Sequence, residues 1–251
     1  MTTQKMLSKL RKGISTYKMI NDGDKIAVGI SGGKDSVALL KLLAEYRRFS
    51  PEKFDLVAIT IDLNFKGQEK DYLGIKELCD GYGIEYVIEK TQIGDIVFDL
   101  RKESSPCSLC SKMRKGALYD VATKMGANKV ALGHHSNDLT ETFLLSLFYE
   151  GRLSTFAPKS FLSKTGLTLI RPMIFLEENE VVCFVRDQNL PVYKSFCPVN
   201  ESTKRERVKQ LINNLSKEED LKDLKQMLFT ALIHPDRYNL FDKFEKQIDQ
   251  F

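Results

Sequence analysis

The sequence lacks any apolar run long enough to cross a membrane. A bilayer-spanning helix needs about 18 or more apolar residues, and no segment of the 251 residues approaches that length. The first 21 residues contain no apolar core of a secretory signal peptide. Internal repeats and low-complexity segments are absent too. We therefore expect a soluble, cytoplasmic protein with no membrane partner.

The chain also has little surplus charge and few cysteines. Its 38 Lys and Arg residues exceed the 34 Asp and Glu residues by four, which permits a nucleic-acid partner without requiring one. Five cysteines, an odd number, indicate metal or redox chemistry rather than a disulfide framework in an intracellular chain. Cys79 and Cys183 fall in predicted helices without a nearby partner cysteine, so we expect both to be core residues.

The segment Lys25–Ser36 is the clearest feature that is present. A β-prone stretch, KIAVGI, ends at Ser-Gly-Gly-Lys-Asp-Ser, and a helical pattern follows. This order predicts a phosphate site, because Gly32 and Gly33 let backbone N–H groups turn inward and the helix dipole favours an anion. The other motif residues add a positive charge and hydroxyl groups: Lys34, Ser31 and Ser36. The spacing is not that of a Walker A motif, so an ordinary γ-phosphate NTPase is not predicted.

Polar residues also follow two later strands. Asp62 lies near the end of the second predicted strand, residues 56–63, and the run GHHSND at 133–138 follows the fourth, residues 129–132. Ligands bind at the carboxyl ends of parallel strands in open α/β sheets. The sequence therefore predicts nucleotide contacts from these ends: Asp62, Gly133 and His134. Asp62 could instead be an ordinary loop carboxylate, and His134 and His135 could ligate a metal or, as their place in a turn favours, form local hydrogen bonds.

Asp138 has two compatible interpretations. A carboxylate at a strand end could hold Mg²⁺ against a triphosphate and neutralise charge on leaving pyrophosphate. The same side chain could cap the helix that follows.

A single C-x-x-C pair occurs at Cys107 and Cys110, ahead of a helix predicted to run to about residue 125. Such a pair can bind zinc or an iron–sulfur cluster, or act as a dithiol. A thioredoxin-like pair is not favoured, because this one does not follow the first strand of a short βαβ unit. No second C-x-x-C completes a four-thiolate zinc site.

The pattern as a whole predicts an α/β fold with a doubly wound, mainly parallel five-stranded sheet. The fifth apolar stretch ends at Ile170-Arg171-Pro172, and the last part of the chain has a helical pattern. We expect an N-terminal helix at 1–21, a nucleotide-binding domain at 22–200 and a small helical appendage at 201–251.

Several motifs together carry a family resemblance. SGGKDS at the end of a first strand resembles the PP-loop of N-type ATP pyrophosphatases, which split ATP between the α and β phosphates and adenylate a substrate oxygen. Together with CSLC, GHH followed by Asp138, IRP at 170–172 and the later Cys197, it resembles the tRNA 2-thiocytidine synthetase (TtcA) family. Where G-H-H-x-D-D is usual, Asn137 replaces the first acid, which leaves the thiolated base, cytidine or uridine, undecided.

The resemblance implies ATP-, Mg²⁺- and iron–sulfur-dependent replacement of oxygen by sulfur on a pyrimidine of the tRNA anticodon loop, cytidine by the family's example. It assigns a 4Fe-4S cluster to Cys107, Cys110 and Cys197. Asp35 and Asp138 become the Mg²⁺ ligands, and catalysis is expected from Cys107, Cys110, Asp138 and Lys34. The expected partners are tRNA and a sulfur donor, either a cysteine desulfurase or free sulfide, with a homodimer left open.

Two other functions remain open at this stage. One is a PP-loop ligase that adenylates a small molecule or transfers an amine, for which the three cysteines would be dispensable. The other is a non-catalytic, zinc-bearing RNA-binding module. Whether sulfur comes from a cysteine persulfide or from cluster-bound hydrosulfide is also open. Basic residues near the cysteine segments are candidate tRNA-phosphate contacts, or simply solvated charges: Lys112, Arg114, Lys115, Arg152, Lys204, Arg205 and Arg207.

Overall fold

The structure is a computed structural model that describes residues 2–65, 71–100, 106–193 and 204–234. Contacts within the chain divide it into two units. The first comprises Met1–Ser136 and Phe156–Glu201, and the second comprises Asn137–Thr155 and Ser202–Phe251. Within the described ranges, none of the helices combines the length and the apolar character that a bilayer crossing needs.

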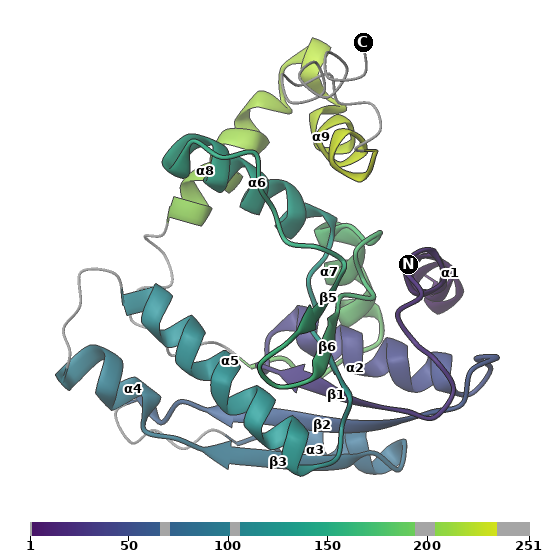
Figure 1. The fold of residues 1–251 in the computed structure, drawn as a ribbon. Coiled ribbons are helices and arrows are strands. Elements are labelled where there is room, and N and C mark those ends of the chain that lie inside the picture. The colour runs from purple at the N-terminus through teal and green to yellow at the C-terminus, as the bar shows by residue number, and fades with distance from the viewer. Residues whose placement is uncertain (1, 66–70, 101–105, 194–203, 235–251) are drawn as a thin grey trace, which may run out of the picture. The chain divides into compact units, whose positions relative to one another are not determined.

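The first unit is built around a six-stranded sheet in the order β3-β2-β1-β4-β6-β5 (Figure 1). The neighbouring strands are parallel except for the β5–β6 pair. The chain runs outward from β1 through β2 to β3 and then returns to the other side of β1 with β4. The sheet is therefore doubly wound, and its switch point lies between β1 and β4. The predicted fold class is therefore confirmed. The strands are β1 Asp24–Ile30, β2 Phe54–Asp62, β3 Glu85–Lys90, β4 Lys129–Ala131, β5 Lys159–Leu162 and β6 Leu167–Ile170.

The sheet has one strand more than the five predicted. The additional strand is β5, which forms an antiparallel hairpin with β6 at the sheet edge. Alternate residues of β5 are exposed, including Lys159 and Phe161. An antiparallel edge strand can face water on one side, so β5 lacks the continuous apolar run that identifies the buried parallel strands.

Helices cover both faces of this sheet. On one face, Leu118, Val121 and Ala122 of α5 form a buried cluster with residues of the central strands, among them Val57 and Ile59. On the other face α2, most of which is buried, packs against α1 and α7. The helices of this unit are α1 Thr3–Thr16, α2 Lys34–Arg47, α3 Leu73–Gly81, α4 Ile93–Asp95, the π-helical turn η2 Ile96–Leu100, α5 Pro106–Lys124 and α7 Glu178–Asp187.

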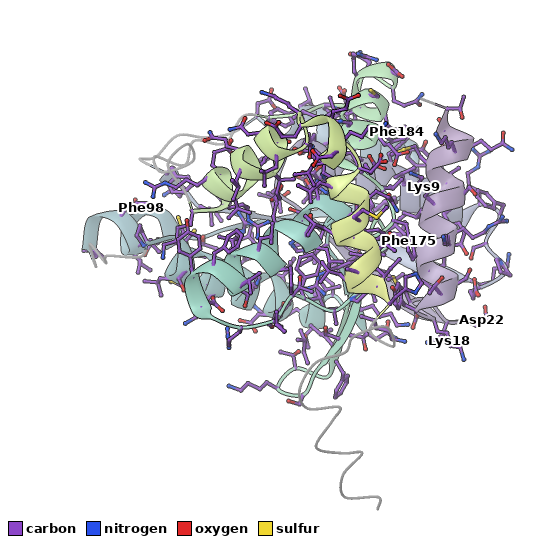
Figure 2. All side chains as sticks on the ribbon, turned by 90° about the horizontal axis from the view of Figure 1, so that it is seen from above. Lys9, Lys18, Asp22, Phe98, Phe175 and Phe184 are labelled. Carbon is purple, nitrogen blue, oxygen red and sulfur yellow. The ribbon has the colours of Figure 1, made fainter. Side chains whose placement is uncertain are left out.

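The N-terminal helix α1 belongs to this unit and is held to it by polar as well as apolar contacts. The ammonium of Lys9 donates to both carboxylate oxygens of Glu180 on α7, each at 2.7 Å. Lys12 lies over the ring of Phe175 at 4.8 Å, and Tyr17 stacks on the same ring. Lys9 and Phe175 can be located together beside α1 in Figure 2.

The second unit is helical. It contains α6 Ser136–Glu150 apart from its first residue, α8 Lys204–Leu215, η3 Glu219–Leu221 and α9 Leu224–Ile233. Its buried cluster joins Leu144 of α6 to Val208 and Ile212 of α8. The expected C-terminal appendage thus clusters with α6, and the domain boundary expected near residue 201 stays a prediction.

A buried ion pair ties the starts of β1 and β4 together. Asp24 and Lys129 are each 4% exposed, and their charged atoms lie 2.6 Å apart. Asp24 also accepts from the Asn128 side chain and the Asn21 backbone, while Lys129 donates to the backbone oxygen of Met19. Every charge in this network has partners, as burial requires.

We expect the substitution Lys129→Met to lower the free energy of unfolding by about 3–5 kcal/mol, because it leaves the Asp24 carboxylate buried without its cation. Urea denaturation measures the loss. The control Lys124→Met changes an exposed lysine at the end of α5 and should stay within about 0.5 kcal/mol of the parent. Equal stability of the two variants would contradict the importance of the pair.

Candidate nucleotide and sulfur site

The turn between β1 and α2 is closed by its own serines. Gly32 has φ +83°, a backbone conformation that residues other than glycine rarely adopt. Ser36 donates its hydroxyl to the Gly33 carbonyl at 2.9 Å and accepts the Ser31 backbone N–H at 3.1 Å. The Gly33 N–H points back to the Ser31 hydroxyl at 3.3 Å. The two serines therefore shape the loop, in addition to their predicted role as phosphate donors.

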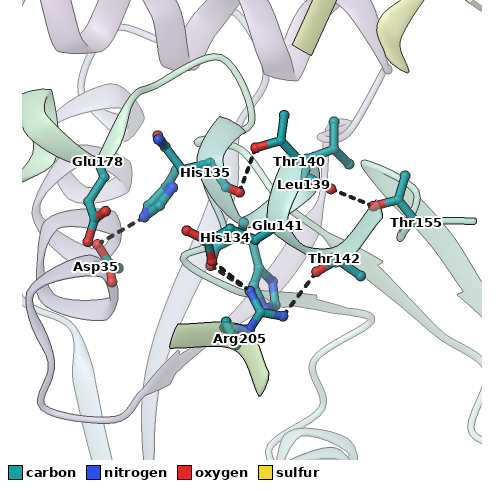
Figure 3. Close-up of polar contacts among 12 residues, drawn as sticks. Asp35, His134, His135, Leu139, Thr140, Glu141, Thr142, Thr155, Glu178 and Arg205 are labelled. Atoms are coloured by element: carbon teal, nitrogen blue, oxygen red, sulfur yellow. Dashed lines mark hydrogen bonds and ion pairs between the residues drawn. The ribbon is translucent and has the colours of Figure 1, made fainter. Parts of the chain in front are cut away.

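The ammonium of Lys34 lies between two carboxylates. It is 3.0 Å from Asp35 and 3.2 Å from Glu178 at the start of α7. Burial lowers the pKa of Lys34, but the two carboxylates outweigh burial and the pKa is raised overall. Lys34 is therefore charged throughout the physiological pH range, as a phosphate-binding cation must be. Figure 3 shows Glu178 beside Asp35.

Glu178 is a site residue that sequence reasoning missed. It lies far from the SGGKDS motif along the chain and carries no motif of its own. Only the packing of α7 against α2 brings it to Lys34. The capping box formed by Glu177 and Glu180 marks the start of α7, but it does not reveal which residue α7 opposes.

The segment that follows β4 lies in close contact with the phosphate loop. A Cβ atom on Gly133 would lie 2.7 Å from the Asp35 carbonyl oxygen and 3.2 Å from the Ser36 nitrogen. The next residues also face the site: His135 is buried with its Nε2 3.7 Å from Asp35 Oδ1, and His134 accepts a hydrogen bond from Arg171 at 3.3 Å through Nδ1. The structure thus brings Gly133 against the loop, and its contact with a nucleotide stays a prediction.

Asp62 lies at the carboxyl end of β2, on the same edge of the sheet as the loop. Its carboxylate accepts the Asn64 backbone N–H at 3.1 Å, and its carbonyl accepts the Thr91 N–H at 2.9 Å. These bonds fix the turn after β2. Its contact with a nucleotide stays a prediction.

Cys107 and Cys110 lie within the first turns of α5, which begins at Pro106. The pair thus lies at the start of the predicted helix, inside it rather than ahead of it. Residues three apart on a helix share a face, and Cys107 is exposed while Cys110 is half-buried. Burial, with Asp80 nearby, raises the pKa of Cys79 to about 12, consistent with an inert core thiol, whereas Cys183 is half-buried rather than fully core.

The third predicted cluster ligand, Cys197, lies outside the described residues. Among those that are described, no three His, Cys, Asp or Glu side chains gather as metal ligands. The chemistry of the donor set still fits an iron–sulfur cluster, because two accessible thiols one helical turn apart supply soft ligands.

Asp138 is the third residue of α6 and belongs to the second unit. Because α6 begins at Ser136, Asp138 does not occupy the cap position, and that interpretation was wrong. Its carboxylate lies 3.3 Å from the Arg205 guanidinium. The same guanidinium contacts Glu141 at 3.2 Å and Thr142 at 3.0 Å (Figure 3). Two of the predicted tRNA-binding cations are thus ion-paired within this unit: Arg205, and Arg152 with Glu150.

A glycine turn carrying SGGKDS, set at the switch point of a doubly wound parallel sheet, defines a nucleotide-binding α/β protein of the PP-loop class. A family model described as a PP-loop domain matches residues 2–215.

Known proteins narrow this class further. The tRNA-cytidine(32) 2-sulfurtransferase of Citrifermentans bemidjiense is 37% identical, over 94% of this chain and 92% of its own. The protein of the same name from Pelobacter propionicus is 39% identical, over 89% of this chain and 84% of its own. A solved structure, the U34-tRNA thiolase NcsA from Methanococcus maripaludis with its 4Fe-4S cluster, is similar with TM-score 0.72 and 25% identity, covering 92% of this chain and 78% of that one. The chain belongs to the tRNA-cytidine(32) 2-sulfurtransferase family of PP-loop proteins, which confirms the resemblance found in the sequence.

We expect Gly133→Ala to reduce ATP-dependent pyrophosphate release by about 100-fold, because the added methyl would displace the start of α2 by a fraction of an ångström or more. Steady-state pyrophosphate assays measure the effect. Gly116→Ala is the control, since nothing lies within 4 Å of a Cβ at that helical position. If both variants release pyrophosphate at the parent rate, the close approach has no role in nucleotide binding.

Proposed function

We propose that this protein replaces the 2-oxygen of a cytidine in the tRNA anticodon loop by sulfur, at the expense of ATP. The observation that carries the proposal is the presence of two sites in one unit: an intact phosphate loop at the sheet's switch point and a pair of thiols on α5, which covers the same sheet. The names of the relatives support cytidine at position 32 of tRNA as the target. The similar thiolase with a 4Fe-4S cluster supports the same class of chemistry.

The phosphate loop would activate the base. Lys34 and the N-terminus of α2 bind the phosphates of ATP, and Asp35 and Asp138 are the proposed Mg²⁺ ligands. The 2-carbonyl oxygen of the base attacks the α-phosphate, and pyrophosphate leaves. Sulfur then adds to the activated carbon, and AMP departs with the original oxygen. Lys34 must exchange a carboxylate partner for phosphate in the first step, so Glu178 is positioned to influence nucleotide affinity.

Cys107, Cys110 and Cys197 are the residues proposed to hold a 4Fe-4S cluster. Bound by three thiolates, the cluster would supply an open coordination site for a soft sulfur nucleophile. Cys197 is four residues beyond Tyr193 in the sequence. Tyr193 donates its backbone N–H to the Gly32 carbonyl at 2.8 Å, which places Tyr193 itself against the phosphate loop.

The proposal also names the substrate, the sulfur donor and the location. tRNA is the substrate, a cysteine desulfurase or free sulfide supplies the sulfur, and the cytoplasm is the expected location. A homodimer stays open. The alternative is a PP-loop adenylating ligase without a cluster, acting on a small molecule or transferring an amine.

Nucleoside mass spectrometry of tRNA tests the function. Cells that carry the gene should contain 2-thiocytidine at position 32, and cells without it should lack this nucleoside. Anaerobically purified protein should be brown and contain about four irons per chain. Cys110→Ala and Cys197→Ala should each abolish thiolation and lower the iron content, whereas Cys183→Ser should retain both.

A colourless Cys197→Ala protein that thiolates at the parent rate would exclude the cluster. AMP formation with tRNA but without any thiolated nucleoside would favour the ligase. One zinc per chain without AMP formation would favour an RNA-binding module.

A further inference from the structure

Arg171 is a buried cation that is not paired with a carboxylate. The residue is 7% exposed, and it directly follows β6, at the strand-end edge of the first unit. Its guanidinium donates to the Ala157 carbonyl and to His134 Nδ1, and it lies 4.6 Å from the centre of the Phe156 ring. All three partners are neutral acceptors or a π face. Within the described part of the chain, Arg171 forms no ion pair.

A second cation, Lys115 of α5, repels Arg171 electrostatically. Lys115 is exposed and also has no ion pair among the described residues. Burial of part of the side chain lowers the pKa of Lys115, and repulsion from Arg171 and Arg114 lowers the pKa further. Burial lowers the pKa of Arg171 to about 10. Two like charges kept together without a counter-charge cost folding free energy, and a bound anion would recover that cost.

We propose that Arg171 and Lys115 form an anion site that binds one phosphodiester of the tRNA next to the modified nucleotide, an inference that rests on the proposed function. The planar guanidinium of buried Arg171 offers paired donors that match phosphate oxygens, and the ammonium of exposed Lys115 adds a flexible charge.

The position of the site favours a tRNA phosphate over a phosphate of ATP. In the order β1-β4-β6, Arg171 is two strands from the phosphate loop, about 10 Å across the sheet. Lys115 is five residues after Cys110 on α5, about 7.5 Å along the helix axis. A phosphate held there therefore lies on the side of the sheet that carries the thiols, whereas the loop phosphates bind at the N-terminus of α2.

Salt-dependent binding of unmodified tRNA transcripts tests the site, in buffers from about 50 to 200 mM salt. Lys115→Gln should weaken binding about tenfold at the lower salt concentration and reduce the slope of log affinity against log salt by about 1. Arg171→Lys, which keeps the charge but not the fork, should weaken binding with a smaller change of slope. Combining the two substitutions should cost less than the sum of their separate effects, because both act on one phosphate.

The matched control is Lys124→Gln, an exposed lysine nine residues further along α5, which should leave affinity and slope at the parent values. The tRNA affinity of Arg171→Gln is compared with that of the parent only after thermal melting shows that the variant folds. If it does not fold, the result for Lys115→Gln alone decides whether the anion site exists. ATP affinity should be unchanged in Lys115→Gln. A raised KM for ATP with an unchanged tRNA slope would assign the site to nucleotide phosphate and overturn the proposal.

Binding does not require thiolation, so the two proposals can fail separately. If Lys115→Gln has the same tRNA affinity and salt slope as Lys124→Gln while 2-thiocytidine still forms, the proposed anion site is wrong and the proposed function stands. If no thiolated nucleoside forms but the slope still depends on Lys115, the function is wrong and the anion site stands.

Discussion

The structure depends on the contact between the end of β4 and the start of α2. Gly133 approaches the Asp35 backbone so closely that no side chain fits between them, and this contact joins the two halves of a doubly wound sheet at the place where they diverge. Parallel strands and helix N-termini converge at such a switch point. The buried Asp24–Lys129 pair holds the opposite ends of the same two strands. Both ends of the β1–β4 pair are thus fixed, and the phosphate loop is held between rigid elements.

Electrostatics around the loop follow from this packing. Lys34 has carboxylate partners on both sides, from its own helix and from α7. Arg171, directly after β6, has only neutral partners among the residues that the structure describes. The first cation can exchange partners when a phosphate arrives. The second keeps its charge available at the edge that faces the thiol-bearing helix. One sheet edge therefore presents two cationic positions, which we propose to bind two different phosphates.

The sequence predicted what depends on local chemistry. The strand, glycine turn and helix around Gly32 are encoded within a dozen residues, so both the site and the parallel sheet follow from pattern and backbone physics. The β5 strand was missed because an exposed edge strand has no continuous apolar run. Glu178 and the isolation of Arg171 from carboxylates were missed because tertiary packing alone creates them. Cys107 and Cys110 were found by their spacing, but their place inside α5 required the structure.

The central claim is that base activation and sulfur insertion occur at one place. A structure of the anaerobically purified protein with a non-hydrolysable ATP analogue tests it most directly. The account predicts that the sulfur atoms of Cys107, Cys110 and Cys197 gather around a cluster at the strand-end edge of the sheet and share one cavity with the α-phosphate. Sulfur atoms that are scattered, or gathered on the side of the sheet away from the glycine turn, would contradict it.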